Sequence, residues 1–344
     1  MSFEKRVNGV INCGILGYGK MGRIRHSAID ECGGRAKVNK VFDVINPDDL
    51  DPEICFCENE KDILEDPKID AIFICTPNFR IPHLCIAGLN AGKHVFSEKP
   101  PGFTADDVEK VIEAEKRARN RKLMYGFNHR HHESIKKMKS IVDSSELGSI
   151  LWMRGRYGKE VDESFFKTWR ADPKLAGGGI LLDQGIHILD LFLHLGGGLD
   201  EVSAFISNHF WKIDGIEDNV FAIYRSSETG ISASLHSTMT QWRYLFSLEV
   251  FLEGGALILN GLKTSSGAYG DEILSIKRNP SHLMDGRFEE EETLTYKVDS
   301  SWESEVLHFF NAIEKKGKII FGSSQDASCL MNLIDQTYGR KCQF

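Results

Sequence analysis

Two acids and a histidine share one short apolar segment of the chain. Asp183, His187 and Asp190 are separated by four and three residues, so an α-helix would place them on nearly one face. Three glycines open the segment, and leucine and isoleucine fill most of it, which predicts a largely buried helix from Gly177 to about Leu195. A buried charge needs a partner or a task. The segment therefore predicts either acid–base chemistry or a structural pair in which His187 bonds Asp183, and by itself it leaves both open.

A glycine-rich turn near the N-terminus offers a second kind of chemistry, the binding of phosphate groups. It has the form G-x-G-x-x-G, follows an apolar run (10–16) typical of a strand, and precedes a segment (21–31) typical of a helix. In this context the glycines allow a tight turn, approach of a pyrophosphate and close helix packing, and the helix N-terminus faces the phosphates. We expect a dinucleotide to be held by Gly17, Tyr18, Gly19, Lys20, Met21 and Gly22.

An acid at the end of the next predicted strand (38–43) favours one dinucleotide over another. Asp43 follows Gly17 by 26 residues. A carboxylate at this place accepts hydrogen bonds from the adenosine ribose and repels a 2′-phosphate. The sequence therefore predicts NAD as the cofactor, with NADP disfavoured.

The elements that must position these residues divide into two groups. Strands and helices alternate over residues 1–127, which predicts a doubly wound parallel sheet, an NAD-binding Rossmann domain. Ligands of such sheets bind beyond the carboxyl ends of the strands, where Thr76 and Lys99 also lie. Strands dominate from 202 to 298 and two amphipathic helices (302–313 and 325–338) follow. Residues 128–344 are therefore predicted to form an α/β domain, with an open, mostly antiparallel sheet covered by helices on one face, for substrate binding and oligomerisation.

Composition excludes several classes of protein. The 344 residues carry a net charge of −8 without a strongly basic block, which argues against nucleic acid as a partner. No apolar run of membrane-spanning length or signal peptide is apparent, and the eight cysteines are scattered. We expect a cytoplasmic protein with free thiols and no membrane partner. The neighbouring histidines at 129, 131 and 132 point in different directions and lack a carboxylate set, so no metal is expected.

Four segments in the right order resemble the Gfo/Idh/MocA oxidoreductases, which include glucose-fructose oxidoreductase, inositol dehydrogenase and related sugar dehydrogenases. The segments are 17–22, 76–78, 92–100 with its E-K-P sequence, and 177–190. The resemblance covers nearly the whole chain. It implies a Rossmann domain followed by an α/β domain with an open sheet, in agreement with the pattern of elements.

The resemblance also implies roles for particular residues. His187 would be the general base that takes the hydroxyl proton while hydride leaves the same carbon for the nicotinamide. Asp183 would orient the substrate or stabilise the charge, and Lys99 would polarise the reacting oxygen and shift the pKa of the base. The strand ends that would border the cofactor are Thr76, Pro77, Asn78, Glu98, Lys99 and Pro100, with Pro100 expected in the cis form as in the family.

Substrate contacts are expected around this set. Asn128 and Arg130 resemble the family's domain-junction segment, although His131 and His132 stand where an aromatic residue and proline often follow. Ile81 also replaces a histidine often found three residues after Asn78. Independently of the resemblance, the Arg170 fork matches a carboxylate or phosphate. The full expected set is Lys99, Asn128, Arg130, Tyr157, Trp169, Arg170, Asp183 and His187.

These residues predict an NAD-dependent dehydrogenase that oxidises a secondary hydroxyl of a sugar, nucleotide sugar or cyclic polyol. One alternative is a non-catalytic, dinucleotide-dependent regulator of the same fold, which would be free to lose the Lys-Asp-His set. Another is a redox-neutral dehydratase or hydrolase that uses transient oxidation. Apolar residues on both faces of strand 245–253 further predict a homodimer or homotetramer through the second sheet. The substrate, the carbon oxidised and the direction of reaction are not specified by the sequence.

Overall fold

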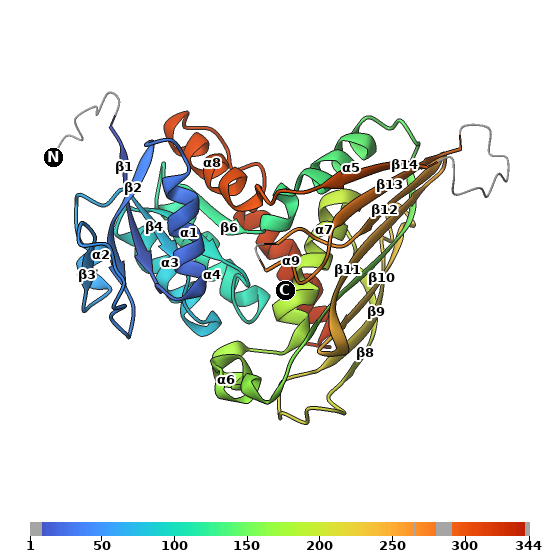
Figure 1. Ribbon diagram of the computed structural model, residues 1–344, viewed down its shortest axis with the longest axis horizontal. Helices are drawn as coiled ribbons and strands as arrows, with labels where there is room; N and C mark the ends of the chain where they lie inside the picture. Colours follow the sequence, from blue (N-terminus) through green and yellow to red (C-terminus); the bar gives the residue numbers. More distant parts are fainter. Residues whose placement is uncertain (1–8, 265, 280–290, 341–344) are drawn as a thin grey trace. The chain divides into compact units, whose positions relative to one another are not determined.

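The computed structural model describes residues 9–264, 266–279 and 291–340, and their contacts divide the chain into two compact units. The first unit contains the residues up to Gly102, Asp106–Gly126 and Trp302–Ala327. The second contains Phe103–Ala105, Phe127–Ser301 and the residues from Ser328. Figure 1 shows the course of the chain through both.

The first unit is built on a parallel sheet of six strands in the order β3-β2-β1-β4-β5-β6. This order confirms the predicted doubly wound sheet, because it reverses direction between β1 and β4, where ligands bind in such folds. The strands are β1 (Ile11–Leu16), β2 (Ala36–Phe42), β3 (Cys55–Cys57), β4 (Ala71–Ile74), β5 (His94–Glu98) and β6 (Leu123–Gly126).

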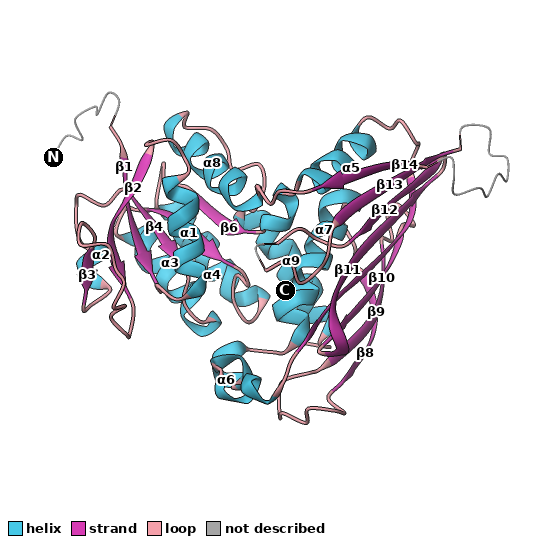
Figure 2. Cartoon of the chain, viewed as in Figure 1, coloured by secondary structure: helices cyan, strands magenta, loops and turns pink. Residues whose placement is uncertain are grey.

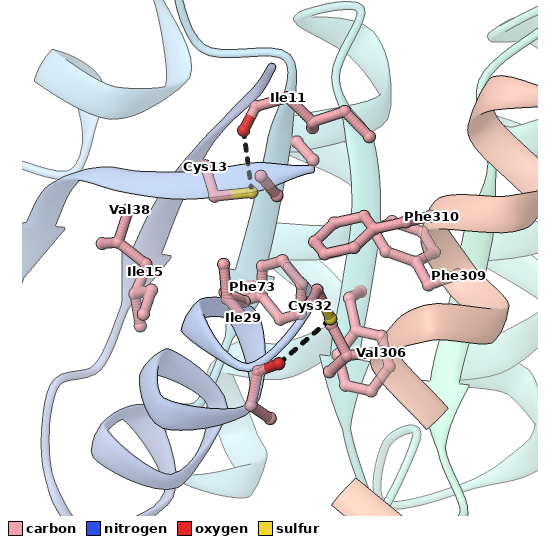
Figure 3. Close-up of a cluster of buried hydrophobic side chains, with 14 of the residues drawn as sticks. Ile11, Cys13, Ile15, Ile29, Cys32, Val38, Phe73, Val306, Phe309 and Phe310 are labelled. Carbon is pink, nitrogen blue, oxygen red and sulfur yellow. Dashed lines mark hydrogen bonds between the residues drawn. The ribbon is translucent and has the colours of Figure 1, made fainter. Parts of the chain in front are cut away.

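Alternate residues of the central strands face two different layers of helices. Phe73 and Phe96 stack at 5.0 Å and belong to a core cluster with Ile29 of α1 and Phe309 and Phe310 of α8, as Figure 3 shows in part. On the other face, Gly88 of α3 lies directly against Ile72 of β4. The helices associated with this sheet are α1 (Lys20–Asp30), α2 (Lys61–Leu64), α3 (Ile81–Asn90), α4 (Ala105–Arg117) and α8 (Ser301–Glu314).

Helix α8 belongs to the first unit except for its first residue, although the sequence prediction groups residues 302–327 with the second domain. The physical reason is a buried charge. Arg25 of α1 is fully buried; its Nε donates to Glu98 of β5 (Nε–Oε1 2.5 Å), and its guanidinium forms an ion pair with Glu305 of α8 (Nη1–Oε2 2.6 Å). A buried guanidinium requires such partners. Long-range pairing of this kind has no signature in local sequence.

The second unit contains an eight-stranded sheet in the order β14-β13-β12-β11-β7-β10-β9-β8 (Figure 2). Strands β7 and β10 pair in parallel and the other recorded pairs are antiparallel, which confirms the predicted mostly antiparallel sheet. The strands are β7 (Ile150–Glu160), β8 (Glu201–Ser207), β9 (Asn219–Arg225), β10 (Ser232–Thr238), β11 (Thr240–Leu252), β12 (Gly255–Asn260), β13 (Glu272–Arg278) and β14 (Glu292–Tyr296).

Three helices, α5 (Glu133–Asp143), α7 (Ile186–Gly196) and α9 (Ser324–Thr337), lie over one face of this sheet in Figures 1 and 2. Helix α7 packs closest at Gly155 of β7, where a Cβ atom would lie 2.3 Å from the Cγ2 atom of Ile188. This contact places the first turns of α7, and with them His187, against the centre of the sheet.

The glycine-entered helix predicted for 177–195 is wrong in its first part. A short helix α6 (Pro173–Ala176) ends at Gly177 with φ +80°, a π-helical turn η5 follows (Leu181–Gly185), and α7 begins at Ile186. Among the described residues, the whole stretch Pro173–Gly196 is long and apolar enough to cross a membrane by length and composition, contrary to the expectation of no such run. However, 78% of its most apolar window is buried in the protein, as in the core helix of a soluble protein.

His94 of β5 should make the protein less stable in acid. The ring is buried, with 8% of its surface exposed, and its Nδ1 atom accepts the backbone N–H of Lys122 (3.0 Å). Burial, followed by the charges of Arg121 and Lys122, lowers the pKa of His94 from 6.5 to about 4. Between these values the unfolded chain binds a proton that the folded chain does not bind. Stability should therefore fall by about 2–3 kcal/mol as the pH is lowered through this range.

Urea unfolding of the wild type and of His94→Gln at about pH 7 and pH 4.5 measures this contribution. The variant should be less sensitive to acid than the wild type by about that amount. An equal loss of stability in the two proteins would show that His94 does not titrate in this way.

Candidate functional site

The turn after β1 is shaped by its first glycine. Gly17 has φ +91°, and its N–H donates to the carbonyl of Phe42 at the end of β2 (2.8 Å). A Cβ atom at this position would lie 2.6 Å from the carbonyl oxygen of Cys75, just after β4. Only glycine fits this conformation and this approach. The turns after β1 and β4 thus meet where the strand order reverses.

The other two glycines of the motif differ in what surrounds them. A Cβ atom on Gly22 would lie 2.2 Å from the carbonyl oxygen of Gly17, so the third glycine is needed for helix α1 to approach the turn. Around Gly19 no heavy atom lies within 4 Å of that position. The space beside Gly19, at the N-terminus of α1, is where a pyrophosphate group can approach the backbone. The turn therefore fits a dinucleotide.

Asp43 lies directly beside this turn. Its Oδ2 atom accepts the N–H of Tyr18 and its Oδ1 atom the N–H of Val44, both at 2.6 Å. The carboxylate therefore holds the glycine turn from the end of β2. Carboxylate oxygens accept more than one hydrogen bond, so both also suit ribose hydroxyl groups.

The remaining residues predicted to border the cofactor lie at the ends of β4 and β5. Thr76 and Pro77 precede a 3₁₀ turn η1 (Asn78–Arg80), in which Asn78 is buried. The peptide bond between Lys99 and Pro100 is cis, as expected from the resemblance. Glu98, in contrast, directs its carboxylate to Arg25, and it is 6% exposed. Its contacts are those of an anchor for the end of β5.

In the second unit, Asp183 of the π-helical turn η5 lies beside two cationic side chains. The Lys159 ammonium group, from β7, bonds its Oδ2 atom, and the Nε atom of Arg170 lies 3.9 Å from Oδ1. Arg170 belongs to a 3₁₀ turn η4 (Trp169–Ala171) and packs its guanidinium over the Trp169 ring at 4.4 Å. Trp169, Arg170 and Asp183 are thus close together, as the predicted site requires. Lys159 was missed, because nothing in its local sequence distinguishes it from a surface lysine.

Glu217 holds the start of the η5 turn. Its carboxylate accepts the N–H groups of Gly179 (2.7 Å) and Leu181 (2.9 Å) and the hydroxyl of Tyr338 (2.8 Å). Burial raises the pKa of Glu217, while the Leu181 N–H and the Tyr338 hydroxyl act in the opposite direction. A Cβ atom on Gly179 would lie 2.1 Å from the Glu217 carbonyl oxygen, so the last position of the three-glycine run has no room for a side chain.

His187 lies in an aromatic environment at the start of α7. Its ring stacks on that of His129, with centroids 3.8 Å apart and an interplanar angle of 21°. The Tyr157 ring lies edge-on to His187, with centroids 5.9 Å apart, and both histidines are at least 95% buried. Burial raises the pKa of Tyr157, so its phenol keeps its proton at neutral pH. Tyr157 can therefore donate a hydrogen bond, whereas an imidazole is the group here suited to accept a proton.

Two further predicted residues have contacts within the protein. Arg130 is buried and forms a two-pronged pair with Asp190 of α7 (Nε–Oδ2 2.9 Å, Nη2–Oδ1 2.7 Å). Asn128 donates to the hydroxyl of Ser301 (3.3 Å). Both residues belong to the 3₁₀ turn η2 (Asn128–His131), which these contacts attach to the rest of the unit. The buried Asp190 is thereby explained as a structural partner.

The described residues contain no group of three or more histidine, cysteine or acidic side chains arranged to hold a metal ion. His132, one of the clustered histidines, bonds Glu272 of β13 (2.9 Å). Burial is the largest single effect on Glu272 and acts to raise its pKa, but the hydrogen bond and charge of His132, with hydrogen bonds from Ser134 and Lys263, together lower the pKa. The site in the second unit therefore consists of an acid (Asp183), a candidate base (His187) and two cationic side chains (Lys159 and Arg170).

Comparison with known proteins agrees with this description. Residues 11–127 match the model of an oxidoreductase family with an NAD-binding Rossmann fold, and residues 135–258 match that of the GFO/IDH/MocA C-terminal domain. An uncharacterised oxidoreductase of Bacillus subtilis, YrbE, is 25% identical over 93% of this chain and 89% of its own length. The scyllo-inositol 2-dehydrogenase (NADP⁺) IolW of the same organism is 27% identical over 90% of this chain and 79% of its own.

The levoglucosan dehydrogenase of Pseudarthrobacter phenanthrenivorans is 29% identical over 57% of this chain and 54% of its own length. Among solved structures, a levoglucosan dehydrogenase in complex with NADH and levoglucosan has a TM-score of 0.82 at 20% identity. The superposed region covers 97% of this chain and 98% of the levoglucosan dehydrogenase chain. At this identity the structural likeness concerns the fold.

Proposed function

The chain belongs to the GFO/IDH/MocA oxidoreductases, and we propose that it oxidises a secondary hydroxyl group of a sugar, nucleotide sugar or cyclic polyol with NAD. The observation that carries the proposal is the pair of sites described above. A glycine turn with room for a pyrophosphate lies in one unit, and a buried histidine one helical turn after an acid in the sequence lies in the other. Relatives named as dehydrogenases of levoglucosan and inositol support the substrate class.

NAD rather than NADP is proposed because of Asp43. Its carboxylate is fixed at the end of β2 by the N–H groups of Tyr18 and Val44. A fixed negative charge beside the adenosine ribose repels a 2′-phosphate. The relative IolW is named as an NADP⁺ enzyme, so the choice of cofactor has to be measured for this chain.

When bound, the nicotinamide supplies the acceptor for hydride from the carbinol carbon. The chain's own residues handle the proton and the position of the substrate. His187 takes the proton from the hydroxyl group, because a neutral imidazole is a suitable base near neutral pH. Asp183 orients the hydroxyl group and stabilises the imidazolium that forms, and Lys99 polarises the oxygen.

Substrate contact is assigned to Trp169, Arg170 and Lys159. The last two carry positive charge beside Asp183, so together they suit a substrate with a carboxylate or phosphate group. Arg130 is assigned a structural role because Asp190 occupies its guanidinium fork. A cytoplasmic location is proposed because the seven cysteines that the structure describes are all free thiols, as is usual in a reducing compartment.

The experiment is a steady-state assay of absorbance at 340 nm with NAD and, separately, NADP. The substrates are inositols, free hexoses, uronic acids and nucleotide-linked sugars. Reduction of NAD by one of these classes, and a higher kcat/KM for its anionic members, is the expected result. Turnover that prefers NADP would overturn the role of Asp43, and equal kcat/KM for neutral and anionic members would overturn that of Lys159 and Arg170.

A homo-oligomer through the large sheet is also proposed. The face opposite the helices exposes Phe205 (80%), Phe221 (51%) and Ile223 (61%), around a hollow of about 660 Å³. Phe205 and Phe221 are directly paired across β8 and β9. An exposed apolar area of this kind favours burial against another copy.

Light scattering at micromolar concentration should give at least twice the chain mass of 38.8 kDa, and Ile223→Glu should lower the measured mass. A wild-type monomer would contradict this assignment.

A further inference from the structure

His129 is buried between His187 and the central strands β7 and β11 of the eight-stranded sheet, and the proposed reaction gives it no part. Its ring is 4% exposed and stacks on His187, while Tyr157 (5.3 Å) and Phe246 (5.9 Å) flank it from β7 and β11. The side chain of His187 is therefore bounded by a flat ring on one face and by the edge of Tyr157. Packing of this kind restricts rotation of the His187 imidazole about its χ2 angle.

A chain of hydrogen bonds leads from His129 to a carboxylate. The Nδ1 atom of His129 lies 3.1 Å from Oδ1 of Asn128, and Nδ2 of Asn128 lies 3.3 Å from the hydroxyl oxygen of Ser301. The Ser301 hydroxyl lies 2.6 Å from Oδ1 of Asp299. All four residues belong to the second unit. Here this series is called the Asp299–His129 chain.

The direction of each bond follows from what each group can donate. An ionised carboxylate only accepts, so the Ser301 hydroxyl donates its single proton to Asp299. The Ser301 oxygen must then accept from the amide nitrogen of Asn128. This leaves the amide oxygen of Asn128, which only accepts, facing His129. The proton of that bond must belong to His129, which fixes its imidazole with hydrogen on Nδ1.

We propose that His129 is a positioning residue for the proposed base: the Asp299–His129 chain fixes its tautomer and plane, and its stacked ring fixes the plane of His187. The proposal rests on the proposed function, in which His187 takes the substrate proton. A base must be held within roughly 10–20° of its productive orientation, and supporting side chains supply that precision. Substrate binding does not need this plane, but proton transfer does. His129 should therefore affect kcat more than KM.

Three variants separate the parts of this arrangement. His129→Ala removes the stacked ring, His129→Phe keeps a flat ring without the Nδ1 donor, and Ser301→Ala breaks the chain while leaving both histidines. Ser300→Ala, one residue earlier, is the matched control for Ser301→Ala. His129→Ala should lower kcat on the order of ten- to a hundredfold with little change in KM. His129→Phe should recover most of that loss, and Ser300→Ala should match the wild type.

The tautomer is measured directly by long-range ¹H–¹⁵N correlation spectra of the full-length protein labelled at histidine nitrogens. The His129 signal, identified by its absence in His129→Phe, should show hydrogen on Nδ1 in the wild type. In Ser301→Ala it should move toward the Nε2–H form that free histidine prefers. An Nε2–H signal in the wild type would overturn the proposal, and so would equal kcat values for His129→Ala and His129→Phe. If His129→Ala does not fold, the spectra of the other variants still decide. The tautomer measurement needs no substrate, so its result can be interpreted even if the proposed function is wrong.

Discussion

Replacement of His187 by asparagine should lower kcat by about 10² to 10⁴-fold, which is the usual contribution of a general base. Asparagine has nearly the shape of the imidazole but cannot take a proton near neutral pH. His187 is 5% exposed and lies at the start of α7, and replacement by a side chain of similar shape should leave the fold intact. The measurement is steady-state turnover together with the dissociation constant for NADH, which should stay within a few-fold of the wild type.

A second histidine of the same helix provides the control. His194 lies two turns after His187 in α7, and it should be replaceable by asparagine with little change in kcat. Turnover of His187→Asn that equals that of the control would remove His187 from the mechanism. Loss of NADH binding by His187→Asn would instead indicate a structural role, because no residue of the first unit has been altered.

Two alanine variants of the glycine turn should separate folding from cofactor binding. A Cβ atom on Gly22 would meet the carbonyl oxygen of Gly17 at 2.2 Å, so Gly22→Ala must displace the backbone of the turn. Such overpacking costs about 1–3 kcal/mol of stability. At Gly19 the added Cβ atom would meet no protein atom within 4 Å. Gly19→Ala should therefore unfold at the same urea concentration as the wild type.

Both variants should nevertheless weaken NADH binding, by on the order of tenfold or more, because the backbone at Gly19 must approach the pyrophosphate. Urea unfolding and fluorescence titration with NADH measure the two effects. Unchanged affinity in Gly19→Ala would show that the pyrophosphate does not lie beside this residue. Unchanged stability in Gly22→Ala would show that helix α1 is free to move away from the turn.

The parts of the fold that local sequence specifies were predicted well. The glycine turn, Asp43 at the strand end and the alternation of strands and helices depend on residues close in sequence, and the parallel sheet they imply is confirmed. The segment 177–195 shows where local pattern is insufficient. Its apolar periodicity suits an α-helix. However, the carboxylate of Glu217, a residue outside this segment, accepts the N–H groups of Gly179 and Leu181, and a π-helical turn begins there.

Contacts of the predicted site that join distant residues could not be derived in the same way. Asp183 and His187 were expected on one helical face, but each contacts a side chain from another element, Lys159 on β7 for Asp183 and His129 on η2 for His187. Arg25 gave no signal because its partners, Glu98 and Glu305, lie far from it in the sequence. A buried ion pair is defined by burial and geometry, and neither is apparent in a single sequence.

Transfer of deuterium from substrate carbon to cofactor tests the central claim most directly. The protein is incubated with NAD and with inositols or hexoses that carry deuterium on their ring carbons, then denatured, and the released nicotinamide cofactor is analysed by mass spectrometry. Oxidation at a secondary hydroxyl predicts reduced cofactor one mass unit heavier for one substrate class, whether the cofactor dissociates or stays bound during turnover. Consumption of a substrate without deuterium in the cofactor would contradict hydride transfer, and with it the assignment of this chain as a dehydrogenase of sugar-type alcohols.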